Sequence, residues 1–374
     1  MQIRFLDSIA HVAAAQWNAV VGDEPFLRHE FLRALEESGC TTTATGWHPQ
    51  HLAAFDHGEL VAAVPLFLKQ HSFGEFVFDW GWAEAAQRAG LRYYPKLIST
   101  TPLSPVTGPR LFLRADSERA RATLAEAVRE RAQALGASSV HWLFPHAAHA
   151  EWLAAQGYLL RTGYQFHWHN AGYRDFDDFL AGFSADKRKK VKRERRAVAE
   201  VGITLETLTG TALAAVDWEE IYGFYRHTID KHGSHAYLNA DFFARYAALA
   251  PEAIVLVRAR RGATMVGAAF NLRSASALYG RYWGGHEGFP GLHFEACYYT
   301  PIEYGIAQRL QRFEGGAHGE HKIARGFVPA MTYSAHWLQD AALGRAVAAF
   351  LERERFGVQC AMEELSGHAP YKRG

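Results

Sequence analysis

The stretch Phe26-Leu27-Arg28-His29-Glu30-Phe31-Leu32 has a counterpart later in the chain, Tyr237-Leu238-Asn239-Ala240-Asp241-Phe242-Phe243. Each stretch has an aromatic residue, a leucine, two spacers, an acid and two apolar residues. An acid is stabilised in the first turn of a helix, where the helix dipole favours negative charge. We therefore expect both stretches to open helices and to mark an internal repeat.

The segments around the two stretches match in kind and order. In each half, β-rich runs flank a glycine turn, which predicts a hairpin over 52–68 and another over 254–272. A helix is expected before each hairpin unit, at 9–20 and 218–231, and another after it, at 117–135 and about 292–313. This repetition indicates a duplication, and the alternation of strands and helices predicts mixed α/β layers.

The expected domain boundary lies at the end of the first half. A strand is expected at 165–169, and Asn170-Ala171-Gly172 reads as a break. We expect an N-terminal domain over 1–165 and a C-terminal domain over 166–374. An aromatic and proline-rich insertion at 69–110 belongs to the first domain, and it is either a functional loop or a second small core.

Composition bounds the class of protein. The chain has 374 residues, of which 49% are hydrophobic, and a net charge of +1, so no global field draws it to nucleic acid or membrane. No apolar run is long enough for a membrane span, and residues 9–21 lack the features of a signal peptide, which predicts a cytoplasmic protein. The three cysteines, Cys40, Cys297 and Cys360, form no disulfide or zinc pattern.

Several segments together resemble a family of predicted N-acyltransferases grouped with FemAB-like proteins, a branch of the GNAT superfamily. The resemblance covers nearly the whole chain and is carried by residues 71–80, 93–97, 278–284, 292–299 and 319–327. It implies two tandem GNAT-like domains with mixed central sheets, which also accounts for the repeat.

The same resemblance implies an acyltransferase acting on an amine. Fem-type relatives move amino acids from aminoacyl-tRNA to amines of peptidoglycan precursors, whereas other GNAT proteins, such as N-acetyltransferases, use acyl-CoA. The donor is therefore a co-substrate, either acyl-CoA or aminoacyl-tRNA, and no permanently bound cofactor is expected. The acceptor is a small-molecule or peptide amine, and tRNA is a candidate partner. The sequence predicts no oligomeric state.

A basic run at 187–196 contains eight cations and one acid. Its helical spacing spreads the cations round every face, so the segment cannot be buried. It resembles the basic helix near the start of the second domain in Fem-type proteins. The hypothesis is that Lys187, Arg188, Lys189 and Lys190 bind an anionic donor such as tRNA, and the alternative is a solvated helix.

The segment from Arg281 to His286 partly resembles the acyl-CoA signature of GNAT proteins. Gly284 and Gly285 would let a pyrophosphate approach the backbone, although His286 stands at the final small position. The alternative is a turn at a strand end with glycine at positive φ.

The catalytic hypothesis centres on titratable residues of the second half. An acceptor amine must lose a proton when it attacks, so a nearby carboxylate or imidazole is required. Glu295 is the candidate base, helped by His293 or by the pair Glu320 and His321. Each of these residues has a structural alternative, as a partnered core acid or a satisfied histidine, and His318 belongs to the same cluster.

Substrate binding is assigned to cationic and aromatic side chains in both domains. Lys322 is a candidate by analogy with the Lys-containing strand end of Fem-type proteins, and it would polarise the reacting carbonyl. The other expected substrate-binding residues are Arg281, Tyr282, Trp283 and Arg325 in the second domain and Asp79, Trp80 and Lys96 in the first.

Other interpretations remain open. A degenerate GNAT pair could bind a cell-wall precursor or RNA without chemistry. A metal-dependent hydrolase built on the His/Glu cluster is weaker, because the spacing fits no zinc motif and no metal is expected. Cys297 as a nucleophile is weaker still. Thr300-Pro301-Ile302-Glu303 reads as a capping box that would break the 292–313 helix, whereas the resemblance favours one bent helix.

Overall fold

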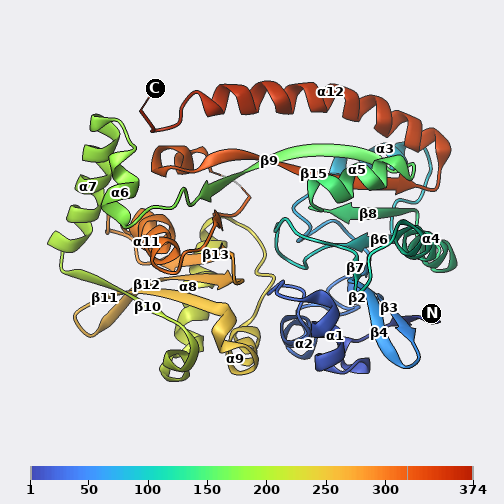
Figure 1. The fold of residues 1–374 in the computed structure, drawn as a ribbon, viewed down its shortest axis with the longest axis horizontal. Coiled ribbons are helices and arrows are strands. Elements are labelled where there is room, and N and C mark those ends of the chain that lie inside the picture. Colours follow the sequence, from blue (N-terminus) through green and yellow to red (C-terminus); the bar gives the residue numbers. More distant parts are fainter. Residues whose placement is uncertain (1, 318, 373–374) are drawn as a thin grey trace. The chain divides into compact units, whose positions relative to one another are not determined.

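The computed structural model describes residues 2–317 and 319–372, and it divides the chain into two compact units (Figure 1). The first unit is Met1–Gly163 with Met331–Cys360, and the second is Tyr164–Ala330 with Ala361–Gly374. The chain passes from one unit to the other inside β9 (Leu159–His169), β15 (Val328–Leu338) and α12 (Ala341–Ser366).

Residues 331–360, expected in the C-terminal domain, lie in the first unit. The reason is local packing. β15 pairs antiparallel with β8 (Ser139–Leu143), with His336 opposite His141. Val347 and Leu351 of α12 pack against Trp82 of α3 (Trp80–Arg88).

The first unit contains two sheets. β1 (Gln2–Leu6), β3 (His51–Asp56), β4 (Glu59–Val64) and β7 (Phe112–Leu113) form one of them. In the other, β15, β8, β6 (Lys96–Ser99), β5 (Phe67–Lys69) and β2 (Trp47–Pro49) follow in that order. The helices are α1 (Ala14–Val21), α2 (His29–Glu37), α3, α4 (Glu118–Ala134) and α5 (Ala147–Ala155). The 69–110 insertion therefore contributes α3 and β6 to the unit.

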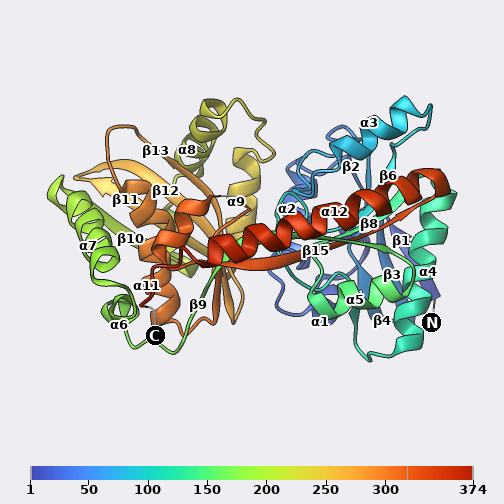
Figure 2. The same cartoon turned by 90° about the horizontal axis from the view of Figure 1, so that it is seen from above.

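The second unit has one mixed sheet in the order β10 (Ile203–Leu208), β11 (Ile254–Arg261), β12 (Thr264–Arg273), β13 (Ala277–Gly285), β14 (Arg312–Glu314) and β9. Its helices are α6 (Phe176–Ala181), α7 (Ala185–Glu200), α8 (Trp218–Lys231), α9 (Ala240–Leu249) and the segment 292–307. α8 and α9 lie side by side (Figure 2).

Helices cover both faces of β13. Neighbouring residues of a strand point to opposite faces. The Tyr282 ring lies 5.1 Å from that of Tyr225 in α8, whereas the Trp283 ring lies 5.7 Å from His293 in the 292–307 segment.

The internal repeat is visible as matching element order. α1, α2, β3 and β4 in the first unit correspond to α8, α9, β11 and β12 in the second. Asn239 caps α9 through its side chain, which accepts from the Phe242 amide at 3.0 Å. Glu30 and Asp241 both lie in first helical turns, as the helix dipole favours.

The segment after β13 is one helix with a π-helical turn. It comprises α10 (Leu292–Phe294), the π turn Glu295–Tyr299 and α11 (Thr300–Ala307). The predicted capping box is wrong, because Thr300 has helical φ and ψ values and its hydroxyl donates to Glu295 at 3.0 Å. The helix ends at Ala307, earlier than expected, and Phe313 belongs to β14.

Candidate active site

A cavity of about 110 Å³ lies in the second unit between β12, β13 and the helix that follows β13. It is the place where several of the expected site residues come together. Its walls are formed by Ala269, Asn271, Gly280, Arg281, Tyr282, Trp283, His293, Cys297, Tyr298 and Gly315.

The cavity lies where the parallel strands β13 and β14 cease to pair. β13 and β14 pair only over three residues, from Ala277 opposite Arg312 to Tyr279 opposite Glu314. β13 then continues to Gly285 along β12. The β14-facing edge of β13 beyond Tyr279 therefore has no strand partner among the described residues, and its backbone groups border the cavity.

A β-bulge places Arg281 at this site. Phe270 faces Tyr282 while Asn271 faces Gly280, so Arg281 is the extra residue. A bulge redirects a side chain and increases local twist. Asn271 is fixed by its own amide, which donates to the Val255 carbonyl at 2.9 Å.

The π turn supplies the opposite wall. A π turn inserts one extra residue into a helix and is frequent at functional sites. Here it brings Cys297 and Tyr298 to the cavity beside His293. The His293 ring packs 5.4 Å from Tyr298 and 5.8 Å from His321.

The titratable groups of this wall are uncharged near neutral pH. Burial, reinforced by His321, Arg325 and Lys322, lowers the pKa of His293 to about 4. Burial raises the pKa of the Cys297 thiol well above its usual value. Thiolate chemistry at Cys297 is therefore disfavoured, whereas His293 is in the form that accepts a proton.

Lys322 lies directly behind the cavity wall. It is 2% exposed, and its ammonium donates to the Gly316 carbonyl at 3.0 Å. A Cβ on Gly315, a wall residue, would lie 3.0 Å from Phe327 Cε1 and 3.3 Å from Lys322 Cε, so both side chains pack closely behind this glycine. Burial lowers the pKa of Lys322 to about 8, and Arg281 acts in the same direction. The ammonium form still dominates at pH 7.

Glu295 lies away from the cavity and holds an ion pair. Both of its oxygens accept from Arg195 Nε at 3.1 Å, and Arg195 also reaches Glu303 at 2.8 Å. Glu295 is 4% exposed and is absent from the cavity wall. These contacts match the structural alternative, a partnered core acid.

Arg325 is also engaged by the protein itself. Its guanidinium donates to Glu194 at 3.1 Å and to the His321 carbonyl at 2.7 Å, and it lies over the Phe294 ring. Tyr299 donates to the same Glu194 carboxylate. Arg195 thus links α7 to the 292–307 helix through Glu295, and Arg325 contacts both elements through Glu194 and Phe294.

The second expected acid/base pair is exposed. Glu320 and His321 lie on the 3₁₀ segment Glu320–Arg325, where His321 Nε2 shares a hydrogen bond with the Tyr298 hydroxyl at 2.9 Å. His321 thus touches a wall residue, whereas Glu320 does not line the cavity. His318 lies outside the described residues.

Gly284 and Gly285 lie inside β13 rather than in a turn. They pair with Ala268 and Gly267 of β12, and neither has a positive φ. A Cβ on Gly284 would come within 2.0 Å of the Phe224 carbonyl, so this glycine allows α8 to pack against the strand. Packing therefore accounts for Gly284 without a phosphate.

The basic run forms α7, as an exposed helix with two buried valines. Within the described chain, Lys192 pairs with Asp177, and Arg195 pairs with Glu295 and Glu303. The other cations have no acidic partner there. They are Lys187, Arg188, Lys189, Lys190, Arg193 and Arg196.

In the first unit, the expected binding residues Asp79 and Lys96 are bonded to each other. Lys96 is fully buried and donates to Asp79, to Glu75 at 2.7 Å and to Ser72 at 2.8 Å. Tyr93 also donates to Asp79. Trp80, by contrast, is 41% exposed.

Several groups of this buried network have shifted pKa values, among them Glu75, Lys69 and Asp79. Burial raises the pKa of Glu75 to about 7 and lowers that of Lys69 to about 7. Burial also acts to raise the pKa of Asp79, but Lys96 outweighs it and the value falls to about 2. Glu75 and Lys69 lie in the 69–110 segment and were not predicted, because their burial depends on the fold.

The described residues contain neither a cluster of metal ligands nor a helix able to cross a membrane. In 2–317 and 319–372, no three His, Cys, Asp or Glu side chains converge as metal ligands. Across the same ranges, no helix has the length and apolar character needed to cross a membrane.

Comparison with known proteins gives one family and several similar structures. Residues 8–373 match the model of a protein family whose description is peptidoglycan biosynthesis/recognition. No curated protein matches the sequence. The structure of FemX is 12% identical with a TM-score of 0.56, covering 93% of this chain and 100% of its own.

Two further structures are similar. L-PGS from Bacillus licheniformis is 11% identical with a TM-score of 0.51, covering 84% of this chain and 93% of its own. A tandem GNAT protein from the clavulanic acid biosynthesis pathway is 11% identical with a TM-score of 0.45, covering 90% and 98%. At these identities the likeness concerns the fold alone.

Proposed function

The chain belongs to the FemAB-like family of peptidoglycan biosynthesis/recognition, and from this premise we propose that its second unit transfers an aminoacyl group from aminoacyl-tRNA to an amine of a peptidoglycan precursor. The observation that carries the proposal is the parted β13–β14 edge. There a cavity of about 110 Å³ brings together Arg281 and His293, with Lys322 directly behind its wall.

The reaction needs a general base, stabilisation of an oxyanion and a general acid. The amine nitrogen forms a bond to the carbonyl carbon of the aminoacyl ester, and its proton passes to neutral His293. The carbonyl oxygen becomes an oxyanion, which Arg281 at the wall stabilises directly and the positive charge of Lys322 stabilises from behind the wall. The ester C–O bond then breaks, and the departing tRNA hydroxyl takes the proton from His293.

In this proposal Glu295 has a positioning role. Its carboxylate orients Arg195 and fixes α7 against the π turn that carries Cys297 and Tyr298. Of the exposed pair Glu320 and His321, only His321 is connected to the cavity wall, through the hydrogen bond that it shares with Tyr298.

The choice of donor rests on two features of the second unit. Six cations of α7 have no acidic partner among the described residues, and they provide a surface for phosphates, which bind by releasing counterions. The alternative donor, acyl-CoA, lacks its expected glycine turn, because Gly284 and Gly285 are paired inside β13. Aminoacyl-tRNA is therefore the better supported donor.

Native mass spectrometry of the purified protein, titrated separately with acetyl-CoA and aminoacyl-tRNA, tests the donor. Selective binding of aminoacyl-tRNA supports the proposal, and charge reversal at Lys187, Arg188, Lys189 and Lys190 should abolish it. Selective binding of acetyl-CoA would instead indicate a CoA-dependent N-acyltransferase. Binding of a precursor without turnover, for either donor, would indicate a recognition module.

A further inference from the structure

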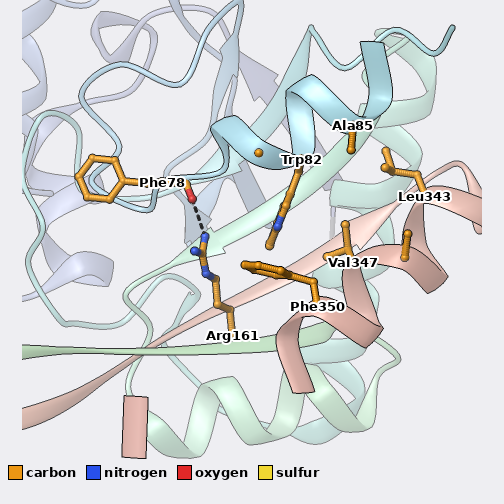
Figure 3. Close-up of a pocket in the computed structure, with 9 residues that line it drawn as sticks. Phe78, Trp82, Ala85, Arg161, Leu343, Val347 and Phe350 are labelled. Carbon is orange, nitrogen blue, oxygen red and sulfur yellow. Dashed lines mark hydrogen bonds between the residues drawn. The ribbon is translucent and has the colours of Figure 1, made fainter. Parts of the chain in front are cut away.

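A second cavity, of about 200 Å³, lies in the first unit between α3 and α12 (Figure 3). Its walls are almost entirely apolar. They are formed by Phe78, Gly81, Trp82, Ala85, Arg161, Leu343, Ala346, Val347 and Phe350. None of these residues takes part in the proposed transfer reaction.

One wall of the cavity is buried in the core, and another is exposed to solvent. Trp82 is 5% exposed, and its ring packs 4.8 Å from buried His336, so the floor is fixed by the core. Phe350 is 39% exposed and its ring lies near Trp82, whereas the Phe78 ring points away (Figure 3). This apolar surface is partly exposed to water, so covering it with an apolar ligand is favourable.

The dimensions favour a hydrocarbon chain. The α12 wall runs from Leu343 to Phe350, which at 1.5 Å per residue is about 10 Å long. A dry apolar cavity of about 150 Å³ accepts benzene, or about 25 Å³ per carbon, so 200 Å³ holds about eight carbons. A volume of this size spread over that length is narrow, which fits a single chain better than a fused ring.

Arg161 indicates which polar group a bound hydrocarbon chain would bear at its end. Its guanidinium donates to both Glu354 oxygens, at 2.8 and 2.6 Å, and to the Phe78 carbonyl at 2.8 Å. These bonds use three of the five donors of an arginine. Because Glu354 already neutralises the charge, the remaining donors favour an uncharged acceptor, such as an amide or ester carbonyl, over a carboxylate.

We propose that this cavity binds the acyl chain of an uncharged acyl amide or ester, about eight carbons long. The site is built from the first unit alone and does not depend on the function proposed for the second. Each added methylene contributes about 0.8 kcal/mol when buried, which is about a fourfold change in Kd.

The test is a chain-length series of N-methyl alkanamides from four to twelve carbons, titrated by calorimetry against the full-length protein. The expected result is a Kd that falls about fourfold per methylene and levels off near eight carbons. Octanoate should bind more weakly than N-methyloctanamide. Absence of saturable binding, or affinity that keeps rising to twelve carbons, would overturn the proposal.

Two variants locate the binding. Ala346→Phe fills the cavity from α12, and Gly81→Leu fills it from α3, where a Cβ meets no atom within 4 Å. Both should weaken N-methyloctanamide binding at least tenfold. Ala349→Phe is the matched control, because Ala349 is an exposed residue of α12 outside the cavity wall. Equal loss in all three variants, or in none, would contradict the site.

Discussion

Arg195 holds both carboxylate oxygens of Glu295 at 3.1 Å, so the acid that the sequence suggests as a base is committed to an ion pair. His293, two residues earlier, lines the cavity and is uncharged near pH 7. The two residues therefore differ in what their loss should do, although they lie in one helix.

Glu295→Gln should retain catalysis and lose stability. The weakened hydrogen bonds to Arg195 should lower the free energy of unfolding by about 1–3 kcal/mol, measured by chemical denaturation. The single-turnover transfer rate should stay within about tenfold of the wild type. His293→Asn is the matched comparison, and it should slow transfer by about 10²–10⁴ with little effect on stability. A reversal of these two patterns would restore Glu295 as the base.

Lys322→Met should slow transfer by about 10²–10³, because the oxyanion loses the stabilising positive charge behind the cavity wall. The pH profile gives an independent readout. Since the Lys322 pKa is about 8, the ammonium is present below pH 8 and is lost above it. Wild-type activity should therefore fall above pH 8, whereas Lys322→Arg, which stays charged, should keep its residual activity to pH 9. An activity that rises steadily through pH 9 would assign Lys322 as a base.

Lys96→Met should destabilise the first unit strongly. It would leave the buried carboxylates of Glu75 and Asp79 without their cation, at a cost of about 3–5 kcal/mol. The triple variant Lys96→Met/Glu75→Gln/Asp79→Asn should recover most of this loss in denaturation experiments. If the Lys96→Met variant instead keeps its stability and loses precursor binding, the network of Lys96, Glu75 and Asp79 functions in ligand binding.

Acid should destabilise the protein between pH 6 and pH 5. Burial lowers the pKa of His141 and His167 to about 3, and it lowers that of His336 well below its ordinary value. In this window the unfolded state binds a proton at each histidine that the folded state does not bind, so stability rises with pH. Glu75 acts oppositely, because its raised pKa of about 7 lets the folded state keep a proton that the unfolded state loses.

His149 and His293 act in the same direction, because burial lowers the pKa of each to about 4. The five histidines and Glu75 together give a balance of about four protons. Stability should therefore fall by about 4–6 kcal/mol from pH 6 to pH 5, since each proton contributes about 1.4 kcal/mol per pH unit. His167→Gln should remove about a quarter of this slope. Denaturation curves that are equally stable at both pH values would show that the buried histidines do not set the acid response.

The sequence predicted the elements that local patterns specify. The paired stretches at 26–32 and 237–243, the two hairpins and the basic helix α7 all depend on nearby residues, and the structure has them. Asn239 and Ser117 carry local capping signals and begin α9 and α4. These features are determined by residues close together in the chain, so one sequence was sufficient to predict them.

The features that shape the site depend on contacts between distant residues. The bulge at Arg281 arises from the pairing of β13 with β12, and the burial of Lys322 arises from packing behind Gly315. The burial of Glu75 and the partner of Glu295 also come from other segments. The sequence therefore included Arg281, His293 and Lys322 among its candidates, but it could not separate the cavity residue His293 from the ion-paired Glu295.

The most direct test of the central claim is a single-turnover experiment. The protein is mixed with tRNA charged with a radiolabelled amino acid and with a soluble peptidoglycan precursor that has a side-chain amine, and label in the precursor is measured for the wild type and Lys322→Met. The account predicts label transfer by the wild type and a rate at least a hundredfold lower for the variant. No transfer by the wild type, or transfer from acetyl-CoA in place of aminoacyl-tRNA, would contradict it.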